Sequence, residues 1–113
     1  MLPAVTTTTT SGPIPVNNAG RLSIMLLSSG ISSGNGVFTV QVSNDGTNFA
    51  DYNRITTNVT NTNTQTDTRV ASVTLSTNTT NFLFFPPGDT FAYFRTKVTV
   101  STDGTYSAIA YVN

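Results

Sequence analysis

Residues 36–43, GVFTVQVS, alternate apolar and polar side chains, and this period of two constrains the fold more than any other feature of the chain. In an extended segment Phe38, Val40 and Val42 share one side, while the polar residues between them share the other. That arrangement is typical of a strand that packs on a core through one face. The Asn-Asp-Gly-Thr sequence that follows predicts a tight turn, because glycine accepts positive φ and aspartate bonds its own backbone. We therefore expect a β-hairpin over residues 36–55.

Similar alternating segments recur from Gly20 to the C-terminus, separated by turns that contain Gly, Pro or Asp-Gly. No segment of useful length shows the helical period of 3.6 residues. About seven or eight short strands with turn signals between them predict an all-β fold, an antiparallel β-sandwich that is jelly-roll-like. The inward-facing residues expected outside the first hairpin are Leu22, Ile24, Leu26, Ala71, Val73, Leu75, Ala92, Phe94, Val98, Val100, Tyr106, Ala108, Ala110 and Val112.

The domain organisation follows from the length and from the N-terminal composition. A chain of 113 residues is expected to form one domain, and residues 20–113 are predicted to be that β-sandwich. Residues 1–19 are predicted to form an extended N-terminal arm, because a run of Thr and several prolines disfavour a helix or a central strand. The arm is either a loose terminus or a segment ordered only against a neighbouring chain.

Residues 56–68, TTNVTNTNTQTDT, are almost purely polar. They form either an exposed low-complexity loop or a projecting β-arm, since Thr suits a pleated surface and neither side requires a core. An extended conformation would place a series of threonines on one side: Thr60, Thr62, Thr64, Thr66 and Thr68.

The composition excludes most catalytic and metal-binding chemistry. The chain contains no His, Cys, Glu or Trp, so it has neither the usual general base at neutral pH nor a thiolate ligand. Its five acidic residues are all Asp and lie mostly at predicted turns, without the dense spacing of a calcium loop. The net charge is zero, which disfavours nucleic-acid binding. We therefore predict a protein that is not an enzyme and holds no metal or cofactor.

The sequence also argues against a membrane protein. The start, MLPAV, lacks the basic and apolar regions of a secretory signal, which favours cytoplasmic synthesis without export. The longest apolar stretch, residues 82–87, is too short to cross a bilayer. A membrane-inserting loop at FLFFPPGDTF is a weaker alternative, because Asp89 and the two prolines suit a tight polar corner better.

Several predicted strands are apolar on both sides, which a one-sided sandwich strand does not need. In the C-terminal half Phe91 and Tyr93 fall on the predicted outer side, and Met25 and Leu27 do so near the N-terminus. Either loops or the N-terminal arm cover this second face, or another subunit packs on it, and we favour the subunit. The residues predicted to form the subunit or capsid interface are Phe82, Phe84, Phe85, Phe91, Tyr93, Ile109 and Tyr111.

The stretch GVFTVQVSNDGTNFADYN resembles a hairpin found in β-sandwich proteins of tailed-phage virions. With its small size, lack of Cys, Thr- and Asn-rich polarity, Pro/Thr-rich N-terminus and aromatic second face, the chain resembles the small jelly-roll capsid decoration (cement) proteins of tailed bacteriophages. The resemblance implies a homo-oligomer, most simply a trimer, that binds the major capsid protein on the capsid surface of the virion after synthesis in the host cytoplasm. It also implies stabilisation of the capsid lattice through protein contacts alone.

Similar hairpins occur in discoidin-like and other glycan-binding sandwiches. The alternative function is therefore a glycan- or receptor-binding module of a phage tail or fibre, although the lack of Trp counts against it. The aromatic platforms for a sugar would be Tyr52, Tyr93, Tyr106 and Tyr111. A structural piece of a baseplate or neck fits the same sequence.

Overall fold

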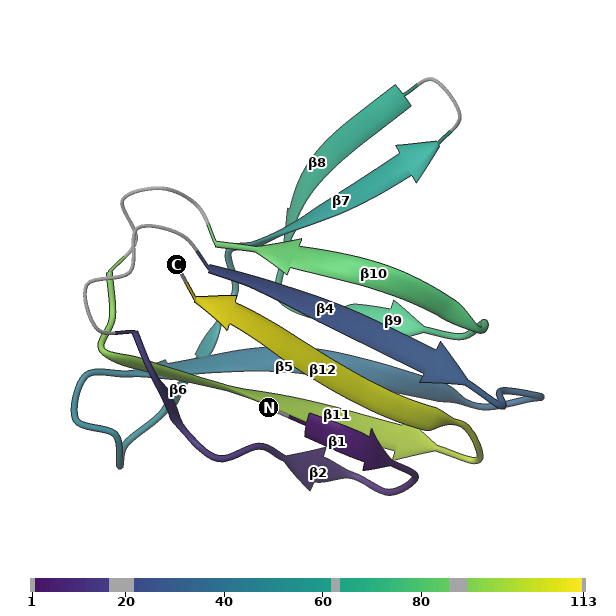
Figure 1. Cartoon of the computed structure of the whole chain (residues 1–113), viewed down its shortest axis with the longest axis horizontal. Helices are drawn as coiled ribbons and strands as arrows, with labels where there is room; N and C mark the ends of the chain where they lie inside the picture. Colours follow the sequence, from purple (N-terminus) through teal and green to yellow (C-terminus); the bar gives the residue numbers. More distant parts are fainter. Residues whose placement is uncertain (1, 17–21, 62–63, 86–89, 113) are drawn as a thin grey trace.

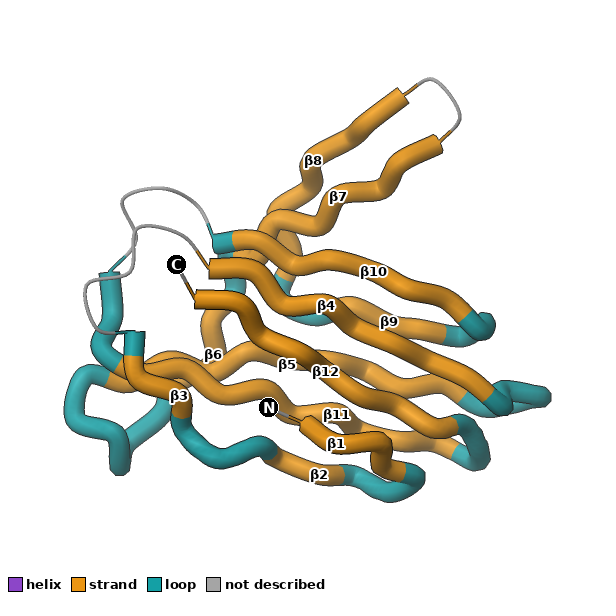
Figure 2. Tube along the Cα trace, in the orientation of Figure 1, coloured by secondary structure: helices purple, strands orange, loops and turns teal. Residues whose placement is uncertain are grey.

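The computed structural model describes residues 2–16, 22–61, 64–85 and 90–112; the side chains of residues 56–61, 64–69 and 84 lie outside this description. Every regular element in these ranges is a β-strand (Figures 1 and 2). The strands are β1 (Leu2–Val5), β2 (Thr9–Thr10), β3 (Ile14–Pro15), β4 (Leu22–Ser29), β5 (Asn35–Ser43), β6 (Ala50–Tyr52), β7 (Ile55–Asn61), β8 (Thr64–Val70), β9 (Val73–Leu75), β10 (Thr79–Phe84), β11 (Tyr93–Ser101) and β12 (Thr105–Val112).

The strands form two antiparallel sheets that pack face to face, which confirms the predicted all-β sandwich. The first sheet has the order β1-β12-β4-β10-β7-β8. The second sheet has the order β2-β11-β5-β6, with β3 also paired to β11 and β9 also paired to β5. The jelly-roll connectivity stays a prediction.

The core lies between the sheets and follows the alternation read from the sequence. Alternate residues of β4, β5, β11 and β12 are buried, so each strand presents one apolar face to the other sheet. Ala71 and Val112 are exposed and were wrongly expected inside, because Ala71 follows the end of β8 and Val112 is the last residue of β12. The fully buried apolar residues are Ile24, Leu26, Phe38, Val40, Ile55, Leu83, Phe94, Val98, Tyr106 and Ala108.

Within residues 2–16 the N-terminal segment forms three short strands that pair with its own chain. β1 lies along β12 at the edge of the first sheet, whereas β2 and β3 lie along β11 at the edge of the second (Figures 1 and 2). Both alternatives considered from the sequence, a loose terminus and ordering only by a neighbour, are therefore wrong over these residues. Edge strands tolerate proline because half of their N–H groups need no partner in the sheet.

Residues 56–61 and 64–68 lie on the paired strands β7 and β8, which project from the sandwich, so for these residues the β-arm alternative is right and the loop alternative is wrong (Figure 1). Thr60 is the cross-strand partner of Gln65, while Thr66 is the partner of Val59. Because opposite residues of an antiparallel ladder share a face, Thr60 and Thr66 belong to different faces. The reversal of the chain thus breaks the predicted single row of threonines, of which Thr62 lies outside the described residues.

The two Asp-Gly-Thr sequences both lie at turns, with positive φ at Gly46 and Gly104. The first joins the paired strands β5 and β6, as predicted, whereas the second joins β11 and β12, which lie in different sheets, so the hairpin expected there is wrong. The carboxylate of Asp45 accepts hydrogen bonds inside its own turn, from the Thr47 and Asn48 N–H groups at 2.8 Å each. The carboxylate of Asp103 instead crosses to the loop between β4 and β5, where it accepts from three consecutive backbone N–H groups, those of residues 32–34. Asp103 therefore ties two connections at one end of the sandwich together.

The substitution Thr96→Val is expected to raise the free energy of unfolding by about 1 kcal/mol. Thr96 is fully buried in β11, and its Oγ1 has no hydrogen-bond partner in the described part of the chain. Valine has the same shape without the hydroxyl, and the backbone N–H of residue 96 keeps its bond to the Ser11 hydroxyl at 3.0 Å. Urea denaturation measures the effect.

The matched control is Thr99→Val, at an exposed position on the same strand, which should change the free energy of unfolding by less than about 0.5 kcal/mol. A lower stability for Thr96→Val would contradict the prediction and would mean that the hydroxyl has a bonding partner in solution.

Candidate protein-interaction surface

The outer face of the first sheet carries a row of large apolar side chains across three neighbouring strands. Met25 on the central strand β4 is the direct cross-strand partner of both Phe82 on β10 and Ile109 on β12. The exposed fraction is 42% for Phe82 and 51% for Ile109, while Met25 between them is half-buried. Directly opposite residues of antiparallel strands lie within side-chain contact distance, so the three side chains form a continuous apolar row.

Two further residues extend this row along the strands. Leu27 lies two positions along β4 from Met25, and Tyr111, with 67% of its surface exposed, lies two positions along β12 from Ile109. Met25, Leu27, Phe82, Ile109 and Tyr111 together are called the apolar strip. Their cross-strand neighbours from residues 23–29, 79–84 and 105–112 are all uncharged.

The outer face of the second sheet is polar by contrast. Arg95, Gln41 and Asp51 are cross-strand partners on β11, β5 and β6. The Arg95 Nε donates to Gln41 Oε1 at 2.7 Å, and the Gln41 Nε2 donates to Asp51 Oδ1 at 2.8 Å. The guanidinium carbon of Arg95 also lies 4.0 Å from the centroid of the Phe49 ring. These three side chains bond one another and carry charge, so the two sides of the sandwich differ in chemistry.

The seven residues predicted as the interface are therefore divided among three places. Phe82, Ile109 and Tyr111 belong to the apolar strip. Phe84 lies on the same sheet, where its backbone pairs with Ser23, and the side chain of Phe84 is outside the described part. Tyr93 lies on the opposite sheet, where a Cβ on Gly46 would come within 3.3 Å of its ring.

Phe85 and Phe91 belong to an aromatic cluster at the rim of the core. Their ring centroids are 5.1 Å apart. The centroid of the buried Phe94 ring lies 5.7 Å from that of Phe85 and 6.4 Å from that of Phe91. Tyr52 completes the cluster, at 5.4 Å from Phe85. The prediction that Phe91 is on the outer face is wrong, because residue 91 precedes the start of β11 at Tyr93 and so does not follow its alternation.

Met25, the centre of the strip, was not among the residues predicted as the interface. Met25 and Leu27 oppose the inward residues of their strand, as expected from the alternation, but neither was assigned to the contact. The pairing of β4 with both β10 and β12 makes them central, and that pairing depends on contacts between distant parts of the chain.

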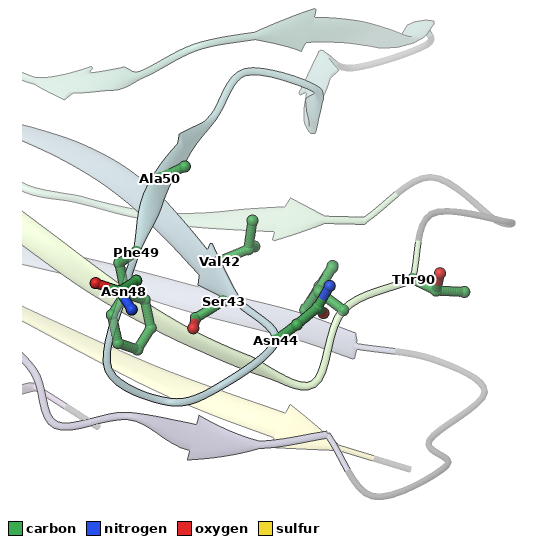
Figure 3. A pocket seen from close by; sticks show the side chains of 8 residues that line it. Val42, Ser43, Asn44, Asn48, Phe49, Ala50 and Thr90 are labelled. Atoms are coloured by element: carbon green, nitrogen blue, oxygen red, sulfur yellow. The ribbon is translucent and has the colours of Figure 1, made fainter.

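A shallow recess of about 330 Å³ lies beside the turn that follows β5 (Figure 3). Its polar lining includes Ser43, Asn44, Asn48 and Thr90, and two phenylalanines contribute ring surface. The backbone and side chain of Asn48, together with the Thr47 N–H and the Ser43 hydroxyl, donate hydrogen bonds that hold the pKa of Asp45 well below its usual range.

The four tyrosines considered as sugar platforms do not gather at this recess. Tyr106 is fully buried and cannot present its ring, so its assignment as a platform is wrong. Tyr52 belongs to the aromatic cluster, Tyr93 lies against Gly46, and Tyr111 belongs to the apolar strip.

Within the described residues no three potential Asp, Glu, His or Cys ligands gather around one point, and no helix is long and apolar enough to cross a membrane. A comparison with protein-family models found no family that matches the chain. Searches of curated proteins and of solved structures likewise found no match.

Proposed function

We propose that this chain is a virion structural protein, a capsid decoration (cement) protein that self-associates and stabilises the capsid lattice through protein contacts. The observation that carries the proposal is the apolar strip, an uncharged set of large side chains on the outside of the first sheet. A contiguous exposed apolar patch on a small protein marks an interaction surface. Large apolar rings and chains at the centre of such a patch supply most of the binding free energy.

A second copy of the same chain fits this strip. In an isologous contact the same surface patch of both copies meets, so a patch without charges meets an equally neutral patch and buries no unpaired charge. The strip and its immediate cross-strand neighbours are neutral, whereas the second sheet presents Arg95, Lys97 and Asp51. The polar second sheet then stays outside the self-contact. The trimeric state and the contact with the major capsid protein rest on the family resemblance.

The substitution Ile109→Asp tests the proposal. A carboxylate at a half-exposed position should leave the sandwich folded but place an unpaired charge inside the contact, raising the dissociation constant of the oligomer at least about 100-fold. Light scattering and analytical ultracentrifugation measure the oligomeric state, and cosedimentation measures binding to undecorated tailed-phage capsids.

The matched control is Thr99→Asp, which adds the same charge at an exposed position of the second sheet and should change neither measurement. A wild-type protein that stays monomeric at high concentration and does not bind capsids would overturn the proposal, as would an Ile109→Asp variant that assembles normally.

The second candidate function, a glycan- or receptor-binding module, is favoured by the recess beside Asn44 and Asn48. Amide and hydroxyl groups next to aromatic rings are the usual chemistry of a neutral sugar site. Asn44 Oδ1 accepts a bond from the Ala92 N–H at 3.1 Å, which fixes the orientation of this amide at the recess. A glycan array distinguishes the two functions: binding to sugars without binding to capsids would reverse their ranking.

A further inference from the structure

The β7–β8 hairpin presents an open strand edge away from the sandwich (Figures 1 and 2). Within the described residues β7 is paired with β10 only at Thr56 and Thr57, whereas β8 pairs with β7 over its whole length from Ile55 to Asn61. β8 is the terminal strand of the first sheet, so its second edge has no partner strand in the described chain.

An open edge of this kind is a template for another strand. A two-stranded ribbon is only marginally stable in water, and unpaired N–H and C=O groups along its edge are satisfied by strand addition. Residues 64–70, TQTDTRV, contain no Pro or Gly, and their Thr and Val residues favour strand conformation. Proteins that avoid edge pairing usually place Pro, charged side chains or a bulge there. Residues 64–70 contain no Pro and pair with β7 in unbroken register, and their two charges, Asp67 and Arg69, are of opposite sign.

We propose that β8 pairs antiparallel with β8 of a second copy of this chain, around a two-fold axis at Thr68. In that register Asp67 of each copy lies opposite Arg69 of the other, so the contact contains two cross-strand pairs of opposite charge. The inference goes beyond the proposed function, because it adds a second self-contact that does not use the apolar strip.

Charge complementarity selects this register over its neighbours. A two-fold axis perpendicular to the sheet makes one residue its own partner, and the residue on the axis defines the register. An axis at Asp67 or at Arg69 would place like charges directly opposite each other, which destabilises a strand pair. An axis at Thr66 would place Asp67 opposite Gln65 and form no charge pair. The axis at Thr68 is the one in this set that pairs opposite charges twice.

Single cysteines test the register directly, because the chain contains no Cys of its own. Residues on the axis have Cα atoms about 4.5–5.5 Å apart, within the range that a disulfide spans. Under mild oxidation Thr68→Cys should therefore form a disulfide-linked dimer in high yield. Thr66→Cys is the matched control, since its two copies would lie about 13 Å apart and should remain reduced. Non-reducing gels and mass spectrometry measure both.

Charge reversal supplies an independent readout. Asp67→Arg alone and Arg69→Asp alone should each weaken the β8 dimer about tenfold or more in dissociation constant, because each places like charges opposite each other. The double variant restores opposite charges and should recover the wild-type dissociation constant, measured by sedimentation at low salt.

These measurements are best made in the Ile109→Asp protein, so that the apolar strip does not contribute to association. Failure of the β8 contact is then distinct from failure of the proposed function. The inference is overturned if Thr66→Cys cross-links as well as Thr68→Cys does, if neither cross-links, or if the double charge variant fails to dimerise.

Discussion

Replacing Tyr106 by alanine is expected to lower the free energy of unfolding by about 3–5 kcal/mol, a large part of the stability of an ordinary small domain. Tyr106 is the largest fully buried side chain in the described core. Its ring meets the ring of Phe38 edge-on, with centroids 6.2 Å apart and planes at 70°. Removing the ring deletes this contact and leaves a void between the two sheets.

The surroundings of Tyr106 make that void difficult to fill. A Cβ on Gly36 would lie 2.5 Å from the Tyr106 ring, and a Cβ on Gly104 would contact its hydroxyl oxygen, so glycine backbone forms two walls of the space. Backbone held in paired strands and a tight turn cannot collapse onto a missing ring as a flexible side chain would. The cost of the truncation should therefore fall at the upper end of the usual range.

The conservative variant Tyr106→Phe separates the ring from the hydroxyl. The hydroxyl donates to the backbone carbonyl of Asp103 at 2.9 Å, and its loss should cost about 1 kcal/mol. Burial, and then the charge of Asp103, raise the pKa of Tyr106 above its usual 10.0. The folded protein thus favours the neutral phenol, so this contribution to stability is complete below pH 10 and is lost as the pH rises through the raised pKa.

Urea denaturation between neutral and alkaline pH measures the free energy of unfolding of the wild-type protein and of the two Tyr106 variants. The wild-type protein should lose more stability above pH 10 than Tyr106→Phe does, since phenylalanine has no proton to lose. Equal stability losses for the alanine and phenylalanine variants at neutral pH would contradict the argument, because the hydroxyl rather than the ring would then carry the effect.

Tyr106 itself could be placed from the sequence, whereas the glycines that surround its ring, Gly36 and Gly104, could not. Alternation is a local property, so it placed Phe38, Val40 and Tyr106 on inner faces correctly. The contact of Tyr106 with Gly36 joins strands from different parts of the chain, and no local pattern contains that information. The fold class and the hairpin of β5 with β6 were therefore predictable, whereas the pairing of strands distant in the sequence was not.

The same limit applies to the candidate interface. The sequence identified residues on the wrong side of their strands for a simple sandwich, but only the order β10-β4-β12 shows which of them are neighbours. It brings Phe82, Met25 and Ile109 into one row and leaves Tyr93 on the other sheet. The N-terminal segment was misjudged for a related reason. Prolines exclude a central strand, but they are compatible both with a free arm and with an edge strand of the same chain, and the structure has the edge strand.

Phe91→Asp is expected to unfold the protein or to lower its free energy of unfolding by at least about 3 kcal/mol, although sequence alternation alone would have made it a surface change. The Phe91 ring packs against Phe85 at 5.1 Å and against the buried Phe94 at 6.4 Å. Aspartate would remove those contacts and place a carboxylate beside two apolar rings, where it loses hydration without gaining a partner.

Ile109→Asp is the matched comparison, because it introduces the same carboxylate at a position with 51% of its surface exposed. Its free energy of unfolding as a monomer should change by less than about 1 kcal/mol, while its association through the apolar strip is lost. Chemical denaturation together with ultracentrifugation measures both quantities for each variant. A folded, monomeric Phe91→Asp protein would place Phe91 in the interface after all, and the assignment of the aromatic cluster to the core rim would have to be abandoned.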